Sequence, residues 1–418
     1  MKRLCVKPTV KLNIDSPLLY LLIALCGINF LDGYFYLAFI TFFAVVLLRK
    51  GRVVVSGNLF LLLLFSLSMM LFGFSYLYRV NGVNGLLKCF LYPISFFIGE
   101  NMMERDKDNE KRTTHIILII IFSLALHGIL NMFNNFVTGG SQRNSIDFWT
   151  QSISAATRQA CLFVLLCGAF FWCFFLQKNR FIQAFCLLLV AAMMYYNTVI
   201  IASRTLIILI IVGILFPLLL CVLNFSGDKT NARYRVLLRV FLAAILILAL
   251  YLVLYYTNAF GFKRLIDSSN LMVRIQQGFF RDKRNVSRAM YLELMWKYPF
   301  GGNYLREITN RYGHDILLSA LNTGGIPSAL ILLAFLISFI YQTVKLYLMR
   351  TYSFSFRVLV FTLYATALIQ FALEPILDGE HWFFGCVLIF SGAVNYLIKH
   401  PEHQSGTARL TETESDEG

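Results

Sequence analysis

The sequence predicts an all-α protein that crosses a membrane many times. Of its 418 residues, 58% are hydrophobic and only 14% are charged, whereas a soluble domain carries about a quarter charged residues. The hydrophobic residues also come in blocks of roughly 17 to 25, the length that a helix needs to cross the hydrocarbon core. These observations indicate a polytopic integral membrane protein without a sizeable soluble domain.

We expect about twelve transmembrane helices, each marked by one hydrophobic block of suitable length. In chain order the blocks are residues 16–31, 33–48, 58–78, 84–102, 115–137, 153–176, 181–201, 204–224, 236–257, 315–344, 356–376 and 380–398. The predicted organisation is an N-terminal bundle (1–257), a large loop (258–314), three C-terminal spans (315–398) and a polar tail (399–418). The composition of the tail is typical of disorder.

Basic residues predict the orientation of the chain, because Lys and Arg in short loops stay on the cytoplasmic side. Basic runs occur in alternate loops, for example at 49–52, 229–239 and 345–357. This pattern predicts cytoplasmic termini and an outer position for the 258–314 loop, in an inner-membrane type of protein. Much of the net charge of +15 then reflects topology, and we expect no nucleic-acid partner.

The cysteines indicate neither a disulfide framework nor a metal site. All nine lie in predicted spans or in the N-terminal segment, and no CxxC pair or His/Cys pattern occurs. Outer-compartment proteins stabilised by disulfides carry their cysteines in exposed loops. We therefore expect no metal and no cofactor.

The second half of the 258–314 loop reads as a short amphipathic helix over 287–298. Ser287 is a suitable N-cap, and Pro299 with the following glycines would end the helix. Its apolar face would consist of Met290, Tyr291, Leu294, Met295 and Tyr298. This face would lie on the membrane surface or on neighbouring helices.

Charged residues inside the predicted spans require a reason, because each costs at least about 2.5 kcal/mol at the bilayer centre. Lys88 and Arg158 lie near the outer face, where a long side chain either reaches the interface or binds substrate. Glu374 would pair with an arginine or bind the hydroxyls of a polar substrate. His127 is expected to be a hydrogen-bonded packing residue.

Cations also gather at the outer membrane face. Arg204 begins a hydrophobic block, where helix amides and the helix dipole already favour anions. Arg281, Arg284 and Arg288 have the spacing of one helix face, and His314 can exchange a proton near neutral pH. The alternatives are an interfacial arginine, a face that binds lipid headgroups, and a structural histidine. Together the residues favour a site for a diphosphate or a phosphorylated lipid.

Four short motifs lie in and around the loop. They are Ser203-Arg204-Thr205, Ser287-Arg288-Ala289-Met290-Tyr291, Tyr298-Pro299-Phe300-Gly301-Gly302, and His314-Asp315 with Leu318 and Gly324-Gly325. Together they resemble the O-antigen polymerase and ligase superfamily, which carries an Arg-led loop helix, a Pro-Phe-x-Gly turn and a His-Asn-x-x-Leu helix start. The motifs cover residues 200–325, and the pattern of spans covers the whole chain. One departure is Asp315, where the family commonly has asparagine.

The resemblance implies a GT-C-like membrane glycosyltransferase that works without a metal at the periplasmic face, on an undecaprenyl-diphosphate-linked oligosaccharide. It assigns Arg204 and Arg288 to the diphosphate, and His314 either to deprotonation of the acceptor hydroxyl or to a further diphosphate contact. Further substrate contacts would come from Arg281, Arg284, Asp315, Glu374 and Arg158, with Asp315 also able to orient His314. A chain-length regulator and a flippase are the implied protein partners.

Three functions remain open. A polymerase joins lipid-linked repeat units, and a ligase transfers the finished chain to lipid A-core; both use the same site. The stretch from Glu374 to Phe384 and residues 91–93 resemble polymerases, so we favour the polymerase. A lipid-linked oligosaccharide flippase or other transporter would spread charges through a central cavity, whereas here they gather at the outer mouth.

Overall fold

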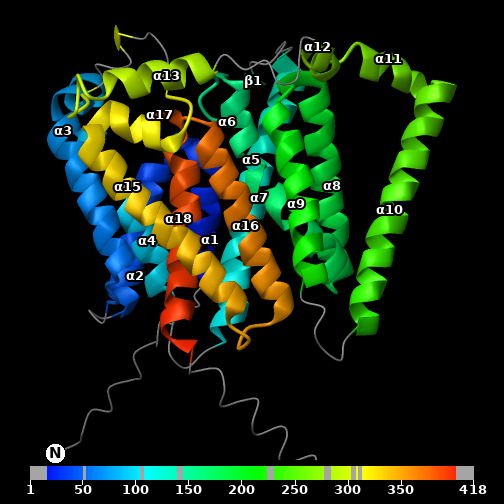
Figure 1. Cartoon of the computed structure of the whole chain (residues 1–418), viewed down its shortest axis with the longest axis horizontal. Coiled ribbons are helices and arrows are strands. Elements are labelled where there is room, and N and C mark those ends of the chain that lie inside the picture. Colours follow the sequence, from blue (N-terminus) through cyan, green and yellow to red (C-terminus); the bar gives the residue numbers. More distant parts are fainter. Residues whose placement is uncertain are drawn as a thin grey trace, which may run out of the picture.

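The computed structural model describes residues 17–49, 53–103, 108–138, 145–223, 230–276, 284–302, 307–308 and 313–401. Within these ranges, the side chains of 80–81, 284–285 and much of 223–248 lie outside the description. Helices make up nearly all of the described chain (Figure 1). One short antiparallel hairpin pairs β1 (Ser145–Ile146) with β2 (Ile153–Ser154). The all-α fold class is therefore confirmed.

The helical elements follow the hydrophobic blocks of the sequence. In chain order they are α1 (Pro17–Ile28), η1 (Phe30–Asp32), α2 (Tyr34–Arg49), α3 (Gly57–Lys88), α4 (Leu91–Asn101), α5 (Asn109–Thr138), α6 (Ala156–Cys161), α7 (Val164–Phe171), η2 (Trp172–Leu176), α8 (Arg180–Tyr196), η3 (Asn197–Ile201), α9 (Arg204–Leu223), α10 (Thr230–Thr257), η4 (Ala259–Gly261), α11 (Phe262–Asp267), α12 (Asn270–Gln276), α13 (Arg284–Leu294), α15 (Ile316–Leu348), α16 (Phe354–Leu373), α17 (Ile376–Gly379) and α18 (His381–Lys399). The segments η2 and η3 are π-helical.

Among the described residues, eight helices are long and apolar enough to cross a membrane, and ten if two bent pairs each count as one span. The protein is thus a multi-pass membrane protein, but the predicted number of about twelve spans is not confirmed. The first two hydrophobic blocks form helices of only 12 and 16 residues. The bends lie at 82–101, where the two halves meet at 42°, and at 245–267.

The helix α18 is the centre of the bundle, and nearly every side chain from Trp382 to Ile398 is buried. It packs backbone to backbone against α4. A Cβ atom on Gly99 would lie 1.7 Å from the Ile389 carbonyl oxygen, and one on Gly392 would lie 2.1 Å from the Phe96 carbonyl oxygen. Small residues allow this close approach, as in other membrane helix pairs.

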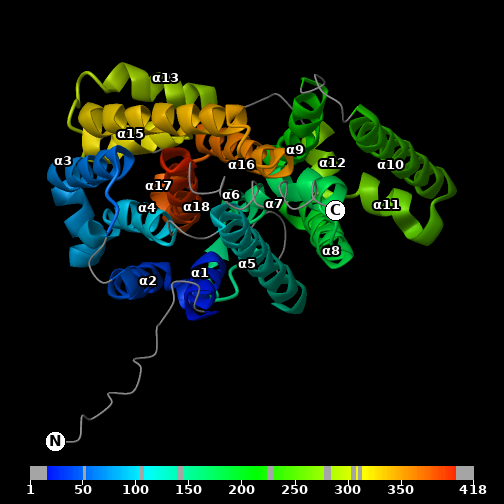
Figure 2. The ribbon, with the colours of Figure 1, turned by 90° about the horizontal axis from the view of Figure 1, so that it is seen from below.

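The short elements gather at one end of the bundle, which we call the loop end: α11, α12, α13, α17 and the β1–β2 hairpin (Figure 1). Seen from below, α13 runs alongside α15, whereas α10 and α11 lie at the periphery (Figure 2). Residues 258–276, in the first half of the large loop, contain η4, α11 and α12. The helix α13 starts at Arg284, so Ser287 is not its N-cap and is buried within the helix.

The long helix α15 is broken near its tenth residue, and the loop fills the break. Pro327 has no N–H group, so the carbonyl of Thr323 has no donor within the helix. Gly302 supplies one, with its N–H donating to Thr323 O at 3.0 Å, and the Ile326 N–H donates to Pro299 O at 2.7 Å. Gly325 has φ 70°, and a Cβ there would lie 2.2 Å from the Pro299 carbonyl oxygen. The Pro-Phe-Gly-Gly turn therefore docks against α15 where only glycine fits.

Candidate functional site

The helix α13 holds Arg288 against the start of α15. Tyr291, on the apolar face of α13, packs against Leu318 and Leu321 of α15. The guanidinium Nη2 atom of Arg288 donates to the carbonyl oxygens of His314, at 3.3 Å, and Ala372, at 2.6 Å. One side chain therefore joins the loop helix, the segment just before α15 and the end of α16.

Asp315 has two separate contacts. Its Oδ1 atom accepts from the Leu318 N–H at 2.7 Å, which makes Asp315 the N-cap of α15. Its Oδ2 atom lies 3.6 Å from Arg288 Nε. Burial raises the pKa of the Asp315 carboxyl group, although the Leu318 amide and the Arg288 charge both favour its ionised form. This carboxylate therefore fixes both the helix start and the arginine beside it.

Arg204 is the first residue of α9 and follows an unusual backbone path. The π-helical segment η3 ends at Ala202, which has φ 49° in the left-handed region. The side chain of Asn197 fixes this turn by accepting from the Ser203 N–H at 2.8 Å. Such π-helical turns are frequent at functional sites. The next residue, Thr205, donates from Oγ1 to Glu374 Oε1 at 3.5 Å.

These contacts bring sequence-distant candidates to the loop end of the bundle. Glu374, which accepts from Thr205, lies two residues after Ala372, whose carbonyl binds Arg288. Arg288 in turn contacts His314 and Asp315. The structure therefore brings the start of α9, the helix α13, the start of α15 and the end of α16 to one place, which we call the Arg288 cluster (Arg204, Arg288, His314, Asp315 and Glu374). Arg281 lies outside the described residues, and Arg284 begins α13 with a side chain that is not described.

Two residues at this end were missed by the sequence reasoning. Arg274 Nη1 donates to the Ala202 carbonyl at 2.6 Å, and Asn270 Nδ2 donates to the Val199 carbonyl at 2.7 Å. Both lie on α12, which therefore covers the turn that leads to Arg204. The basic charge of Arg274 was visible in the loop sequence, but no motif indicated that it would bind a carbonyl in the preceding turn.

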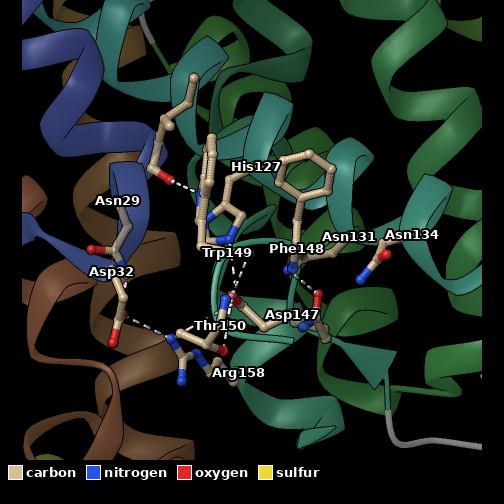
Figure 3. Close-up of polar contacts among 12 residues, drawn as sticks. Asn29, Asp32, His127, Asn131, Asn134, Asp147, Phe148, Trp149, Thr150 and Arg158 are labelled. Atoms are coloured by element: carbon tan, nitrogen blue, oxygen red, sulfur yellow. Dashed lines mark hydrogen bonds and ion pairs between the residues drawn. The ribbon is translucent and has the colours of Figure 1, made fainter. Parts of the chain in front are cut away.

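Arg158 lies among carboxylates instead of at the Arg288 cluster (Figure 3). Its guanidinium is 3.4 Å from Asp32 Oδ1, 3.9 Å from Asp147 Oδ2 and 3.8 Å from Glu380 Oε2. His127 Nε2 lies 3.3 Å from the same Asp147 Oδ2 atom, and both side chains are buried. The burial of His127 suits a packing role, which stays a prediction. The substrate role of Arg158 stays a prediction.

The carboxylates of this network differ in charge state. Burial raises the pKa of Glu380 to about 8, and the neighbouring charges of Glu374 and Asp147 raise it further, although Arg158 opposes them. Burial would also raise the pKa of Asp147, but His127, the Thr150 amide and Arg158 together hold it well below its usual range. At neutral pH, Asp147 therefore carries the charge that balances Arg158, and Glu380 is mainly protonated.

Within the described part of the chain, no group of three or more His, Cys, Asp or Glu side chains is arranged to hold a metal ion. No protein-family model matches the sequence, and no curated protein is detectably similar to it. The O-antigen polymerase/ligase resemblance therefore stays a prediction, supported by the four motifs and by the clustering of their residues. The contacts of this place join Arg288 to the backbone of His314 and to the Asp315 carboxylate, with Arg204 one residue before the Thr205 that donates to Glu374.

Proposed function

We propose that the protein is an O-antigen polymerase, a glycosyltransferase that joins undecaprenyl-diphosphate-linked repeat units at the periplasmic face of the inner membrane. The observation that carries the proposal is the position of Arg288, which contacts the His314 carbonyl and the Asp315 carboxylate where α15 begins. Arg204 starts α9 at the same end of the bundle. The loop end corresponds to the periplasmic face in this proposal.

The two arginines would stabilise the departing lipid diphosphate. Negative charge develops on this group as its bond to the sugar breaks, and fixed cations in a partly desolvated site stabilise such charge effectively. The contacts of Arg288 to two carbonyls use Nη2, and its ion pair uses Nε. They hold the guanidinium in one orientation, so that Nη1 donates to a diphosphate oxygen in the proposed complex.

The transfer itself is a direct displacement. The acceptor hydroxyl oxygen bonds to the anomeric carbon, the bond from that carbon to the diphosphate oxygen breaks, and the diphosphate keeps the electron pair. The hydroxyl proton passes to the His314 imidazole, or to solvent if His314 instead contacts the diphosphate. A single displacement inverts the anomeric configuration and forms no covalent enzyme intermediate. Glu374, held by Thr205, would contact the saccharide hydroxyls.

The test is a lipopolysaccharide gel from a strain that lacks this gene. The strain is complemented with wild type, Arg288→Ala, Arg288→Lys or the control Arg350→Ala, which changes an exposed arginine in the turn between α15 and α16. We expect core with a single repeat unit in the deletion strain, and a restored ladder with wild type and Arg350→Ala only. Lysine keeps the charge but not the planar fork of donors.

Other outcomes would contradict the proposal in distinguishable ways. Bare core with accumulating lipid-linked polymer would indicate a ligase. Accumulation of single lipid-linked repeat units on the cytoplasmic side would indicate a flippase. A full ladder from membranes that contain Arg288→Ala at the wild-type level would remove the diphosphate assignment.

A further inference from the structure

A second polar site lies beside the Arg288 cluster. A cavity of about 130 Å³ opens between α3, α4, α15, α17 and α18. Its lining includes Tyr76, Lys88, Cys89, Tyr92, Asp378 and His381. The break in α3 at Gly82, with φ 59°, turns the last helical segment that carries Lys88. A charged and aromatic cavity within a membrane bundle indicates a polar ligand, because such side chains are costly there without a function.

One side chain connects this cavity to the proposed catalytic loop. Ser319 Oγ lies 3.0 Å from Asp378 Oδ2 and 3.4 Å from the carbonyl oxygen of Gly313, the residue before His314. Ser319 itself is buried. The wall of the cavity and the His314 segment are therefore separated by a single hydroxyl group.

We propose that this cavity binds one sugar ring of the saccharide substrate and selects which sugar can lie next to the reacting hydroxyl. The inference rests on the proposed function. Lys88 offers donors, Asp378 offers acceptors, His381 offers either, and the two tyrosines offer flat apolar surface for a ring face. A few directed polar groups on an aromatic lining are typical of sites that recognise small polyhydroxylated ligands.

The size and charge of the cavity exclude the other parts of the substrate. Pockets for drug-sized ligands measure roughly 300 to 1,000 Å³, so 130 Å³ accommodates about one ring. The Asp378 carboxylate opposes binding of a phosphate, and the charged lining opposes binding of a lipid tail. Lys88 and Asp378 together leave the lining near neutrality, which suits an uncharged sugar.

Cys89 provides a probe of this cavity in the natural chain. The purified full-length protein in detergent is treated with a small thiol reagent, and modification of the Cys89 peptide is followed by mass spectrometry. The rate is compared without ligand and with glucose, galactose, mannose, N-acetylglucosamine, glycerol or inorganic phosphate. The same series is run with Asp378→Asn and with the control Asp108→Asn, which removes a carboxylate before α5.

We expect at least one sugar to slow Cys89 modification several-fold, with glycerol and phosphate without effect. Asp378→Asn should abolish the protection, and Asp108→Asn should retain it. Equal protection by phosphate would show that the cavity binds anions and would overturn the proposed sugar site. The proposal fails if no sugar protects. Because Cys89 is buried, binding of the same sugars in radiolabelled form is also measured by equilibrium dialysis, and the absence of binding that depends on Asp378 would overturn the proposal whether or not Cys89 reacts. The protection experiment measures binding, and the gel measures polymerase activity. The sugar site can therefore be disproved while the proposed function holds, and the proposed function can be disproved while a sugar still binds.

Discussion

Arg288 Nε lies 3.6 Å from the Oδ2 atom of Asp315, at the residue that caps α15. The capping oxygen is the other one, Oδ1. Asp315 therefore joins two functions in one carboxylate, since it starts a membrane helix and holds the arginine that we assign to the diphosphate. Asparagine is common at this position in the family that the sequence resembles. It can cap the helix, but it has no charge with which to hold the arginine.

Substitution of Asp315 should separate these functions. Asp315→Asn keeps an oxygen acceptor for the Leu318 N–H, so we expect near wild-type thermal stability and a shorter or weaker polysaccharide ladder. Asp315→Ala loses the cap as well, which costs about 0.5–2 kcal/mol, so both stability and ladder should decrease. Thermal unfolding in detergent and the gel measure the two effects. An alanine variant as stable as wild type would show that the cap is unimportant.

Substitution of Gly325 should displace the loop from α15. In Gly325→Ala, the new Cβ atom would lie 2.2 Å from Pro299 O, and the residue keeps φ 70°. We expect loss of the ladder, together with faster protease cleavage within 284–302 in the purified protein. The control is Gly57→Ala, where an added Cβ meets no atom within 4 Å. Unchanged cleavage in Gly325→Ala would contradict the docked arrangement of the turn.

Glu380 should make the stability of the protein depend on pH. Its pKa in the folded protein is about 8, above the ordinary carboxyl value of 4.5, so the folded state binds this proton more tightly than the unfolded state. Its contribution to stability is therefore fully present below about pH 4.5 and is lost as the pH rises through about 8. Glu380→Gln removes this titration.

We expect the melting temperature of Glu380→Gln to exceed that of wild type increasingly between about pH 5 and pH 9. The measurement is thermal unfolding in one detergent across a pH series. Parallel curves for the two proteins would mean that Glu380 is already ionised at neutral pH, with Arg158 as its counter-ion.

Replacement of His127 should affect stability and leave the chemistry intact. His127 is buried 3.3 Å from Asp147, and removal of one partner from a buried polar pair typically costs about 1–3 kcal/mol. We expect His127→Ala to unfold at a lower temperature, while the protein that remains folded still produces the ladder. His115→Ala, an exposed position on the same helix, is the matched control. Normal stability with an absent ladder would instead place His127 in the reaction.

The sequence was sufficient to predict an all-α multi-pass protein, but not the number of spans or the places where the helices break. Hydrophobic blocks locate spans because burial in lipid requires them. The breaks at Gly82 and Gly325 instead depend on positive φ angles. Glycine can adopt such an angle, but its presence in a sequence does not show that it does. The start of α13 was predicted three residues too late. Ser287 is a good N-cap by type, but it is buried within the helix.

The candidate site was predictable only where motifs existed. Arg204, Arg288 and His314 were selected because of their types and motifs, and the structure brings their segments to one end of the bundle. The contacts of Arg274 to Ala202, and of Ser319 to Asp378, link residues that are far apart in sequence. No local pattern indicates such pairs, since they arise from tertiary packing. The three carboxylates around Arg158 were missed for the same reason.

The proline in α15 also has a consequence for biogenesis. When this segment enters the bilayer, the carbonyl of Thr323 has no helical donor, and in the folded protein the Gly302 amide supplies one. An unsatisfied peptide group in a membrane costs several kcal/mol, so docking of the loop is favoured by the same free energy. We therefore expect completion of this span and formation of the Arg288 cluster to be coupled during folding. A nascent chain without the docked loop would be a ready target for membrane quality control.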